Sequence, residues 1–110
     1  MINIEQIKLD IIKRLKPLNL ERVVLFGSYA YGTPNDDSDI DLYIVTKDKF
    51  VPQSFREKSA LTKSVSRAIR DLRTIIPIDL IVHTKLMSEK FIELDSSFSQ
   101  EIHSKGTILI

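Results

Sequence analysis

The chain contains no cysteine and no excess of charge of either sign. Without cysteine there can be no disulfide framework, no thiol nucleophile and no zinc–thiolate site. Its 16 Lys and Arg residues are balanced by 15 Asp and Glu residues, which leaves a formal net charge of +1. Such a small charge gives no bulk electrostatic basis for binding nucleic acid or an anionic membrane. We therefore expect no direct nucleic-acid binding.

Long apolar runs are also missing. No stretch approaches the roughly 18 apolar residues that a membrane-spanning helix needs, and the first residues, from Met1 to Glu5, do not resemble a secretory signal. Hydrophobic residues make up 43% and charged residues 28% of the chain, which is ordinary for a globular protein. For 110 residues we expect one domain spanning 1–110, no membrane contact and a cytoplasmic location.

An apolar run that ends in Gly27-Ser28 is the first part of the most informative pattern in the chain. A glycine after a strand lets the backbone approach a ligand closely. The amides of a following helical turn, together with the Ser28 hydroxyl, would suit the phosphates of a nucleoside triphosphate. Taken alone, Gly27-Ser28 also fits a strand-ending glycine followed by a capping serine, and it is the neighbouring aspartates that favour the phosphate interpretation.

Ten residues later the chain reads Asp39-Ile40-Asp41. Side chains alternate between the two faces of a strand, so Asp39 and Asp41 should point the same way. Two like charges on one face repel unless a cation lies between them, and carboxylate oxygens suit Mg²⁺. A polar loop entering an edge strand explains Asp36 and Asp37, but it explains Asp41 poorly because the following residues are apolar. We expect Asp39 and Asp41 to bind the metal.

A third aspartate, Asp79, interrupts the apolar run 75–82. The pattern predicts that this carboxylate lies in the middle of a buried strand, where it needs a partner. It could pair with a buried Arg or Lys, or it could join the other two carboxylates. In the second case the strands at 40–46 and 78–83 should be neighbours.

The remaining pattern predicts an α+β fold, with a small mixed sheet flanked by helices. Capping-box spacing starts helices at Asn3 and Ser54. The expected elements are a helix at 3–16, a strand at 23–26, a helical turn at 28–31, a loop at 32–38, a strand at 40–46, a helix from 54 to about 74, a strand at 78–83, short helices at 88–93 and 97–104, and a strand at 107–110.

Several other polar residues have two interpretations. Lys63, Arg67 and Arg70 share one side of the long helix, where a solvated face is favoured over contact with phosphate or a partner. Tyr29 and Tyr31 flank the phosphate loop and could either contact nucleotide or pack. His83 and His103 lack metal-ligand spacing, and His83 is expected to be structural.

The Gly-Ser, ten residues, Asp-x-Asp pattern, with a later aspartate in an apolar run, resembles the signature of the DNA polymerase β-like nucleotidyltransferases. The short length and the segment from Gly27 to Thr33 resemble the minimal nucleotidyltransferase (MNT) branch, which includes antitoxins of HEPN toxins. That branch commonly has Arg or Lys where this chain has Tyr31. The resemblance implies the nucleotidyltransferase fold, with Mg²⁺ as cofactor. It also implies nucleotide binding at Gly27 and Ser28, and catalytic, metal-binding roles for Asp39, Asp41 and Asp79.

The same resemblance implies a reaction. An NMP, with AMP from ATP as the expected case, would be moved onto a hydroxyl of a partner protein, a tyrosine of a HEPN toxin, so that the chain acts as an antitoxin. One alternative is transfer to a small molecule such as an aminoglycoside. Another is a binding module that neutralises the toxin without catalysis. The base preference, the acceptor and the oligomeric state, including a homo-oligomer, are left open by the sequence.

Overall fold

The computed structural model describes residues 3–35 and 37–110, so the loop assignment of Asp36 lies outside the described residues. The elements in chain order are α1 (Ile4–Leu15), η1 (Lys16–Leu18), β1 (Arg22–Phe26), α2 (Ser28–Tyr31), β2 (Ile40–Val45), α3 (Phe55–Ala68), η2 (Leu72–Thr74), β3 (Ile78–His83), α4 (Lys85–Leu94), α5 (Ser97–Lys105) and β4 (Thr107–Ile108). Within the described ranges, no helix has the length and apolar character needed to cross a membrane.

The four strands form one sheet in the order β3-β2-β1-β4. β2 pairs with β3 in parallel, whereas β1 pairs antiparallel with both β2 and β4. The sheet is therefore mixed and small, and helices flank it, which confirms the predicted α+β class. The strands expected at 40–46 and 78–83 are direct neighbours, as the proposed grouping of their aspartates requires.

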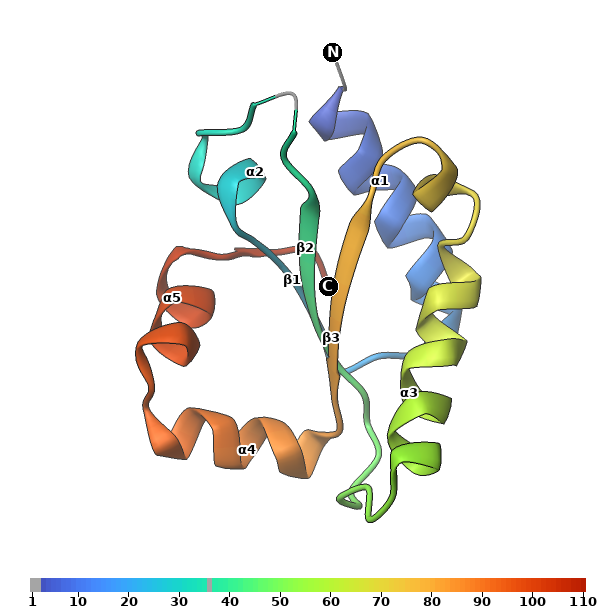
Figure 1. Ribbon diagram of the computed structural model, residues 1–110, viewed down its shortest axis with the longest axis vertical. Coiled ribbons are helices and arrows are strands. Elements are labelled where there is room, and N and C mark those ends of the chain that lie inside the picture. The colour runs from blue at the N-terminus through green and yellow to red at the C-terminus, as the bar shows by residue number, and fades with distance from the viewer. Residues whose placement is uncertain (1–2, 36) are drawn as a thin grey trace.

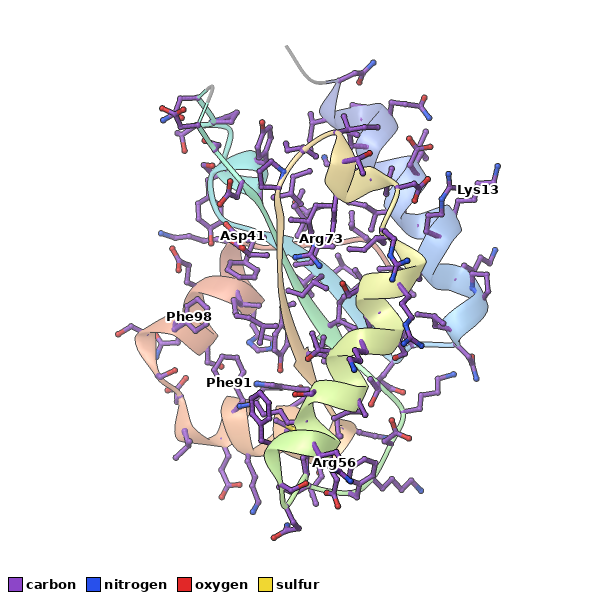
Figure 2. All side chains as sticks on the ribbon, turned by 45° about the vertical axis from the view of Figure 1, so that its right-hand side comes forward. Lys13, Asp41, Arg56, Arg73, Phe91 and Phe98 are labelled. Atoms are coloured by element: carbon purple, nitrogen blue, oxygen red, sulfur yellow. The ribbon has the colours of Figure 1, made fainter. Side chains whose placement is uncertain are left out.

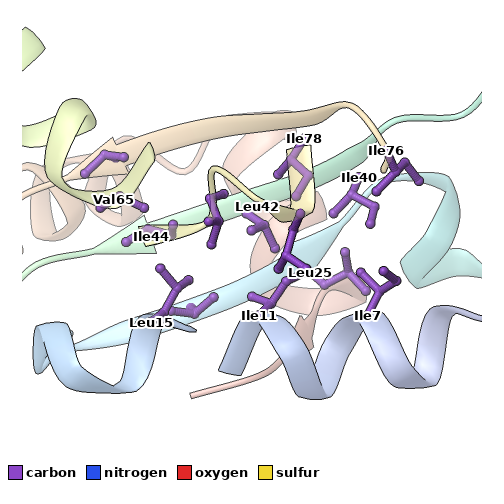
Figure 3. Close-up of a cluster of buried hydrophobic side chains, with 14 residues drawn as sticks. Ile7, Ile11, Leu15, Leu25, Ile40, Leu42, Ile44, Val65, Ile76 and Ile78 are labelled. Carbon is purple, nitrogen blue, oxygen red and sulfur yellow. The ribbon is translucent and has the colours of Figure 1, made fainter. Parts of the chain in front are cut away.

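Helices cover both faces of the sheet (Figure 1). Helices α1 and α3 lie on one face of the sheet. Their apolar side chains pack against those that the strands direct toward them, and together they form the larger core cluster (Figure 3). Its buried members are Ile7, Ile11, Leu15, Val23, Leu25, Ile40, Leu42, Ile44, Val65, Ile69, Leu72, Ile76, Ile78 and Val82. Burying a side chain of this size stabilises the fold by about 1.5–3 kcal/mol, so this face carries most of the packing.

The opposite face carries a smaller cluster under α4 and α5. Its buried members are Val24, Phe26, Tyr43, Val45 and Ile102, with Ile81 and Phe91 packed against them. The chain enters α4 directly from the carboxyl end of β3, so α4 lies at that end of the parallel strands, whereas α5 folds back against β1, where Phe98 packs on Phe26. The amino-terminal ends of β2 and β3 lie toward α2 instead (Figure 1).

Capping explains where the long helices begin. The Asn3 side chain accepts a hydrogen bond from the Gln6 amide at 3.2 Å, and Ser54 accepts one from Glu57 at 3.1 Å, as their spacing predicted. The expectation for α4 was wrong, because this helix begins before Ser88. The hydroxyl of Thr84 accepts a hydrogen bond from the Met87 amide at 3.2 Å and starts the helix at Lys85.

The helix expected to reach about residue 74 is interrupted. α3 ends at Ala68, and a separate 3-10 turn, η2, follows at Leu72–Thr74. Ile69 and Leu72 are both buried, so the apolar spacing continues through the break while the backbone turns. Spacing of three residues fits an α-helix and a 3-10 turn equally well, which is why the pattern did not reveal the interruption.

Candidate active site

Gly27 lies between β1 and α2 and has a backbone that only glycine adopts readily, with φ 79° and ψ −165°. A Cβ at this position would also collide with the carboxylate of Asp41. The Gly27 carbonyl accepts hydrogen bonds from the amides of Ala30 and Tyr31 at 3.0 and 3.1 Å. The amides of Ser28 and Tyr29 come earlier in the turn and have no partner within the helix, so they are available to a ligand.

Asp41 occupies the centre of the candidate site. In the sheet register it pairs with Phe26 of β1 on one side and with Asp79 of β3 on the other. Asp39 precedes β2 by one residue and, like Asp41, is partly buried. The pKa of Asp41 is raised, first by burial and then by the negative charges of Asp79 and Asp39. The structure therefore brings together the three aspartates that the sequence singled out.

The expected setting of Asp79 was wrong in one respect. This residue is exposed and is the second residue of β3, instead of lying in the middle of a buried strand. β3 has a strand neighbour on one side only in the described sheet, and the helix that follows it, α4, starts from its opposite, carboxyl end. A buried Arg or Lys partner for Asp79 is therefore not needed, and its carboxylate is accessible to an incoming group.

The donor set fits Mg²⁺ better than a cation that needs a cage of protein ligands. Among residues 3–35 and 37–110, no group of three or more His, Cys, Asp or Glu side chains is arranged to hold a metal ion by itself. Mg²⁺ usually takes one or two carboxylates and completes its shell with water and substrate phosphates. Asp41 and Asp39 supply such a pair, and the charge repulsion felt by Asp41 is what a cation would relieve.

Tyr31 ends α2 and places its hydroxyl beside this group. The hydroxyl oxygen is buried and has no hydrogen-bond partner among the described residues. The pKa of Tyr31 is raised, first by burial and also by the carboxylates of Glu101 and Asp41, while the Gly27 backbone amide acts in the opposite direction. Glu101, from α5, was missed at the level of sequence, because nothing in its neighbours marks it as lying near Tyr31.

Other candidates lie elsewhere. Tyr29 packs against the larger core cluster, which favours the packing interpretation for that side chain. Lys63, Arg67 and Arg70 are exposed on or just after α3, which covers the face of the sheet opposite Asp41. The solvated-face interpretation of this row therefore stands.

In Figure 2 Asp41 lies on the same side of the molecule as Phe98 of α5.

His83, the last residue of β3, contacts Tyr43 on the sheet face that α4 and α5 cover. A hydrogen bond of 2.8 Å joins the hydroxyl of the fully buried Tyr43 to Nδ1 of His83, and the two rings pack edge to face. Burial lowers the pKa of His83, with a further contribution from the charge of Lys58. His83 is two residues beyond Ile81 and four beyond Asp79 on the same strand face, and its role here is structural, as expected.

Solved structures share this arrangement of strands and helices. A toxin–antitoxin structure determined with AMP-PNP is 21% identical, with a TM-score of 0.52, and the match covers 94% of this chain and 72% of that one. A mutant of the toxin–antitoxin pair MntA-HpeT is 23% identical, with a TM-score of 0.55 and coverage of 100% and 73%. A structure described as a "putative nucleotidyltransferase" from Sulfolobus solfataricus is 29% identical, with a TM-score of 0.53 and coverage of 78% and 70%. The fold is that of the nucleotidyltransferases.

Comparison of the sequence with known families also identifies a nucleotidyltransferase. The model of the nucleotidyltransferase domain matches residues 5–105, and the chain belongs to this family of enzymes. A protein of Methanocaldococcus jannaschii named "Putative protein adenylyltransferase MJ0141" is 34% identical over 99 residues, which cover 90% of this chain and 94% of that protein.

Proposed function

We propose that this nucleotidyltransferase moves AMP from ATP onto a tyrosine hydroxyl of a partner protein, a HEPN toxin, and thereby acts as its antitoxin. The observation that carries the proposal is the position of Asp41, which faces the Gly27 loop on one side and Asp79 on the other. A backbone turn suited to phosphate and the accessible carboxylate of Asp79 therefore both lie beside Asp41. The relative named as a protein adenylyltransferase and the likeness to toxin–antitoxin structures support the choice of acceptor.

In this proposal the amides of Ser28 and Tyr29 and the Ser28 hydroxyl bind the triphosphate and hold it in line for attack. The acceptor oxygen forms a bond to the α-phosphorus as the bond from that phosphorus to the α,β-bridging oxygen breaks. Pyrophosphate leaves, and the tyrosine proton passes to a carboxylate. Asp79 is suited to receive this proton because it is exposed on β3, next to Asp41.

Asp39 and Asp41, with Asp79 beside them, are the residues that would hold Mg²⁺. When bound, the ion neutralises charge on the phosphates and on the reacting oxygens. The protein's own contribution is to hold the carboxylates in place. Asp41 is fixed by two neighbouring strands and by its contact with Gly27, so that the pair is set before nucleotide arrives.

The test is to incubate the purified protein with labelled ATP and Mg²⁺, with and without a purified candidate HEPN partner. We expect little label without the partner and one or more AMP groups on a partner tyrosine with it, located by mass spectrometry. The double variant Asp39→Asn, Asp41→Asn should remain folded and lose transfer. Arg14→Lys is a matched surface control, because Arg14 pairs with Asp71 on the α1 side of the molecule.

Titrating toxin against a small amount of antitoxin separates the alternatives. Neutralisation far beyond one-to-one that disappears in the double variant supports the enzyme. Strict one-to-one neutralisation by wild type and variant alike supports a binding module and contradicts the proposal. Label that enters a low-mass product, never the partner, supports transfer to a small molecule. Full transfer by the folded double variant would contradict the role of the aspartates.

A further inference from the structure

The hydroxyl of Tyr31 is an unusual feature of the candidate site. Its oxygen is buried, yet it has no hydrogen-bond partner among the described residues. Buried polar groups are nearly always paired, and an unpaired one calls for a specific explanation such as a missing ligand. A tyrosine at neutral pH is uncharged and keeps its proton, so the unused capacity is that of a hydrogen-bond donor.

The surroundings of this hydroxyl indicate what it could bind. The Gly27 backbone amide, the Asp41 carboxylate and the Glu101 carboxylate all act on it. The Gly27 amide can only donate, so it cannot receive the tyrosine proton. Glu101 lies near the hydroxyl without reaching hydrogen-bond geometry. Tyr31 therefore stands among the groups of the phosphate loop with a proton to donate.

We propose that the Tyr31 hydroxyl donates a hydrogen bond to a β- or γ-phosphate oxygen of the nucleotide and so sets triphosphate affinity in this chain. The inference rests on the proposed nucleotide site at Gly27 and Ser28. It assigns to Tyr31 the part of binding that discriminates a triphosphate from a monophosphate. Because tyrosine brings no positive charge, the contact adds affinity and orientation without neutralising the phosphates.

Glu101 has the opposite effect in this scheme. Its carboxylate, carried by α5, faces the hydroxyl that would meet the phosphate. A fixed negative charge beside the bound phosphates would repel them and would disfavour ligands in proportion to their charge. In this proposal the Tyr31 hydroxyl attracts the phosphates of the nucleotide, and the Glu101 carboxylate repels them.

The experiment measures the Kd of AMP-PNP, pyrophosphate and AMP in Mg²⁺ for the wild type, Tyr31→Phe, Glu101→Gln and the control Arg14→Lys. Arg14 pairs with Asp71 on the α1 side of the molecule and does not take part in the proposal. For Tyr31→Phe we expect about tenfold weaker binding of AMP-PNP and pyrophosphate, which corresponds to about 1.4 kcal/mol, and unchanged binding of AMP. For Glu101→Gln we expect severalfold tighter AMP-PNP. Turnover should show a raised KM with nearly constant kcat.

Thermal unfolding without nucleotide distinguishes a structural role. Removing a buried, unpaired hydroxyl should leave the Tm of Tyr31→Phe unchanged or higher. A lower Tm together with unchanged AMP-PNP affinity would overturn the inference, as would equal losses for AMP and AMP-PNP. AMP attached to Tyr31 in the intact protein would also overturn it, since the residue would then be an acceptor. If the folded wild type binds no triphosphate, the proposed function itself fails. If transfer depends on Asp39 and Asp41 but not on Tyr31, only this inference fails.

Discussion

The carboxylate of Asp41 lies against the α-carbon of Gly27, so closely that any side chain at residue 27 would collide with it. These residues come from different segments, one from the turn after β1 and the other from β2. Their contact joins the loop suited to phosphate with the carboxylates suited to a cation. The spacing of the two halves of the sequence pattern is therefore a consequence of antiparallel pairing, which sets Phe26 opposite Asp41.

Gly27→Ala should damage both stability and activity. The substitution forces a backbone conformation that costs about 1–3 kcal/mol for a residue other than glycine, and the new methyl group displaces Asp41. We expect a lower Tm and loss of nearly all transfer. Gly32→Ala is the matched control, because Gly32 also has φ 79° but a Cβ there meets nothing within 4 Å. Equal activity losses in the two variants would contradict the proposed contact.

Asp41→Asn should raise the stability of the metal-free protein at neutral pH. The pKa of Asp41 is raised in the folded state, so the folded state holds the proton more tightly and ionisation costs stability. This contribution is present at low pH and is lost as pH rises from the ordinary carboxyl value of about 3.9 through the raised one. The Tm difference between variant and wild type should therefore grow with pH over this window and then level off.

At low pH a second ion pair also changes the Tm, in the direction opposite to the effect of Asp41. The Arg14 guanidinium holds the pKa of Asp71 below its usual range, so this pair loses its contribution as pH falls. Both proteins share the pair, and subtraction removes it. A Tm difference that is constant with pH, or that shrinks as pH rises, would contradict the assigned environment of Asp41.

Asp79→Asn should reduce turnover more than nucleotide affinity. An exposed carboxylate beside Asp41 is placed to act on the acceptor oxygen, and general-base catalysis typically contributes about 10²–10⁴-fold. Single-turnover rates at saturating ATP should fall by roughly 10²-fold or more, while the Kd of AMP-PNP changes little. A collapse of affinity with an unchanged saturated rate would instead place Asp79 in nucleotide binding. Unfolding of the variant is not expected, because the residue is exposed.

His83 should make the fold sensitive to mild acid. Burial lowers its pKa, so the unfolded chain binds the proton more readily than the folded one. The stability that the neutral ring contributes is present above the unfolded value of about 6.5 and is lost as pH falls below it. Wild type should lose Tm between pH 7.5 and 5.5 more steeply than His83→Gln, in which no proton can bind. Parallel Tm curves would contradict this expectation.

The sequence predicted the strands and the meeting of the aspartates because both depend on local pattern. Alternation places Asp39 and Asp41 on one side, and the apolar character of the following residues identifies the strand. Whether β3 lies at the edge of the sheet is a different matter. It depends on strand order and on where α4 and α5 pack, which no local pattern encodes, so the exposure of Asp79 was not foreseen.

The misplaced helix ends have more local causes. Thr84 is an ordinary capping residue, but the strand that ends at His83 and the helix that begins at Lys85 leave no loop between them to mark the boundary. Glu101 illustrates a third limit. It lies beside Tyr31 only because α5 folds back over β1, more than 70 residues after Gly27 in the chain. Long-range approach of this kind leaves no trace in sequence spacing.

The segregation of the two sheet faces has a practical consequence for engineering. Substitutions at well-separated sites usually combine additively, and α1 and α3 pack on the face opposite the carboxylates. A library that varies the surroundings of Asp79 to accept new hydroxyl compounds could therefore begin from a scaffold already reinforced on α1 and α3. The stability gained on one face would be available to offset losses on the other.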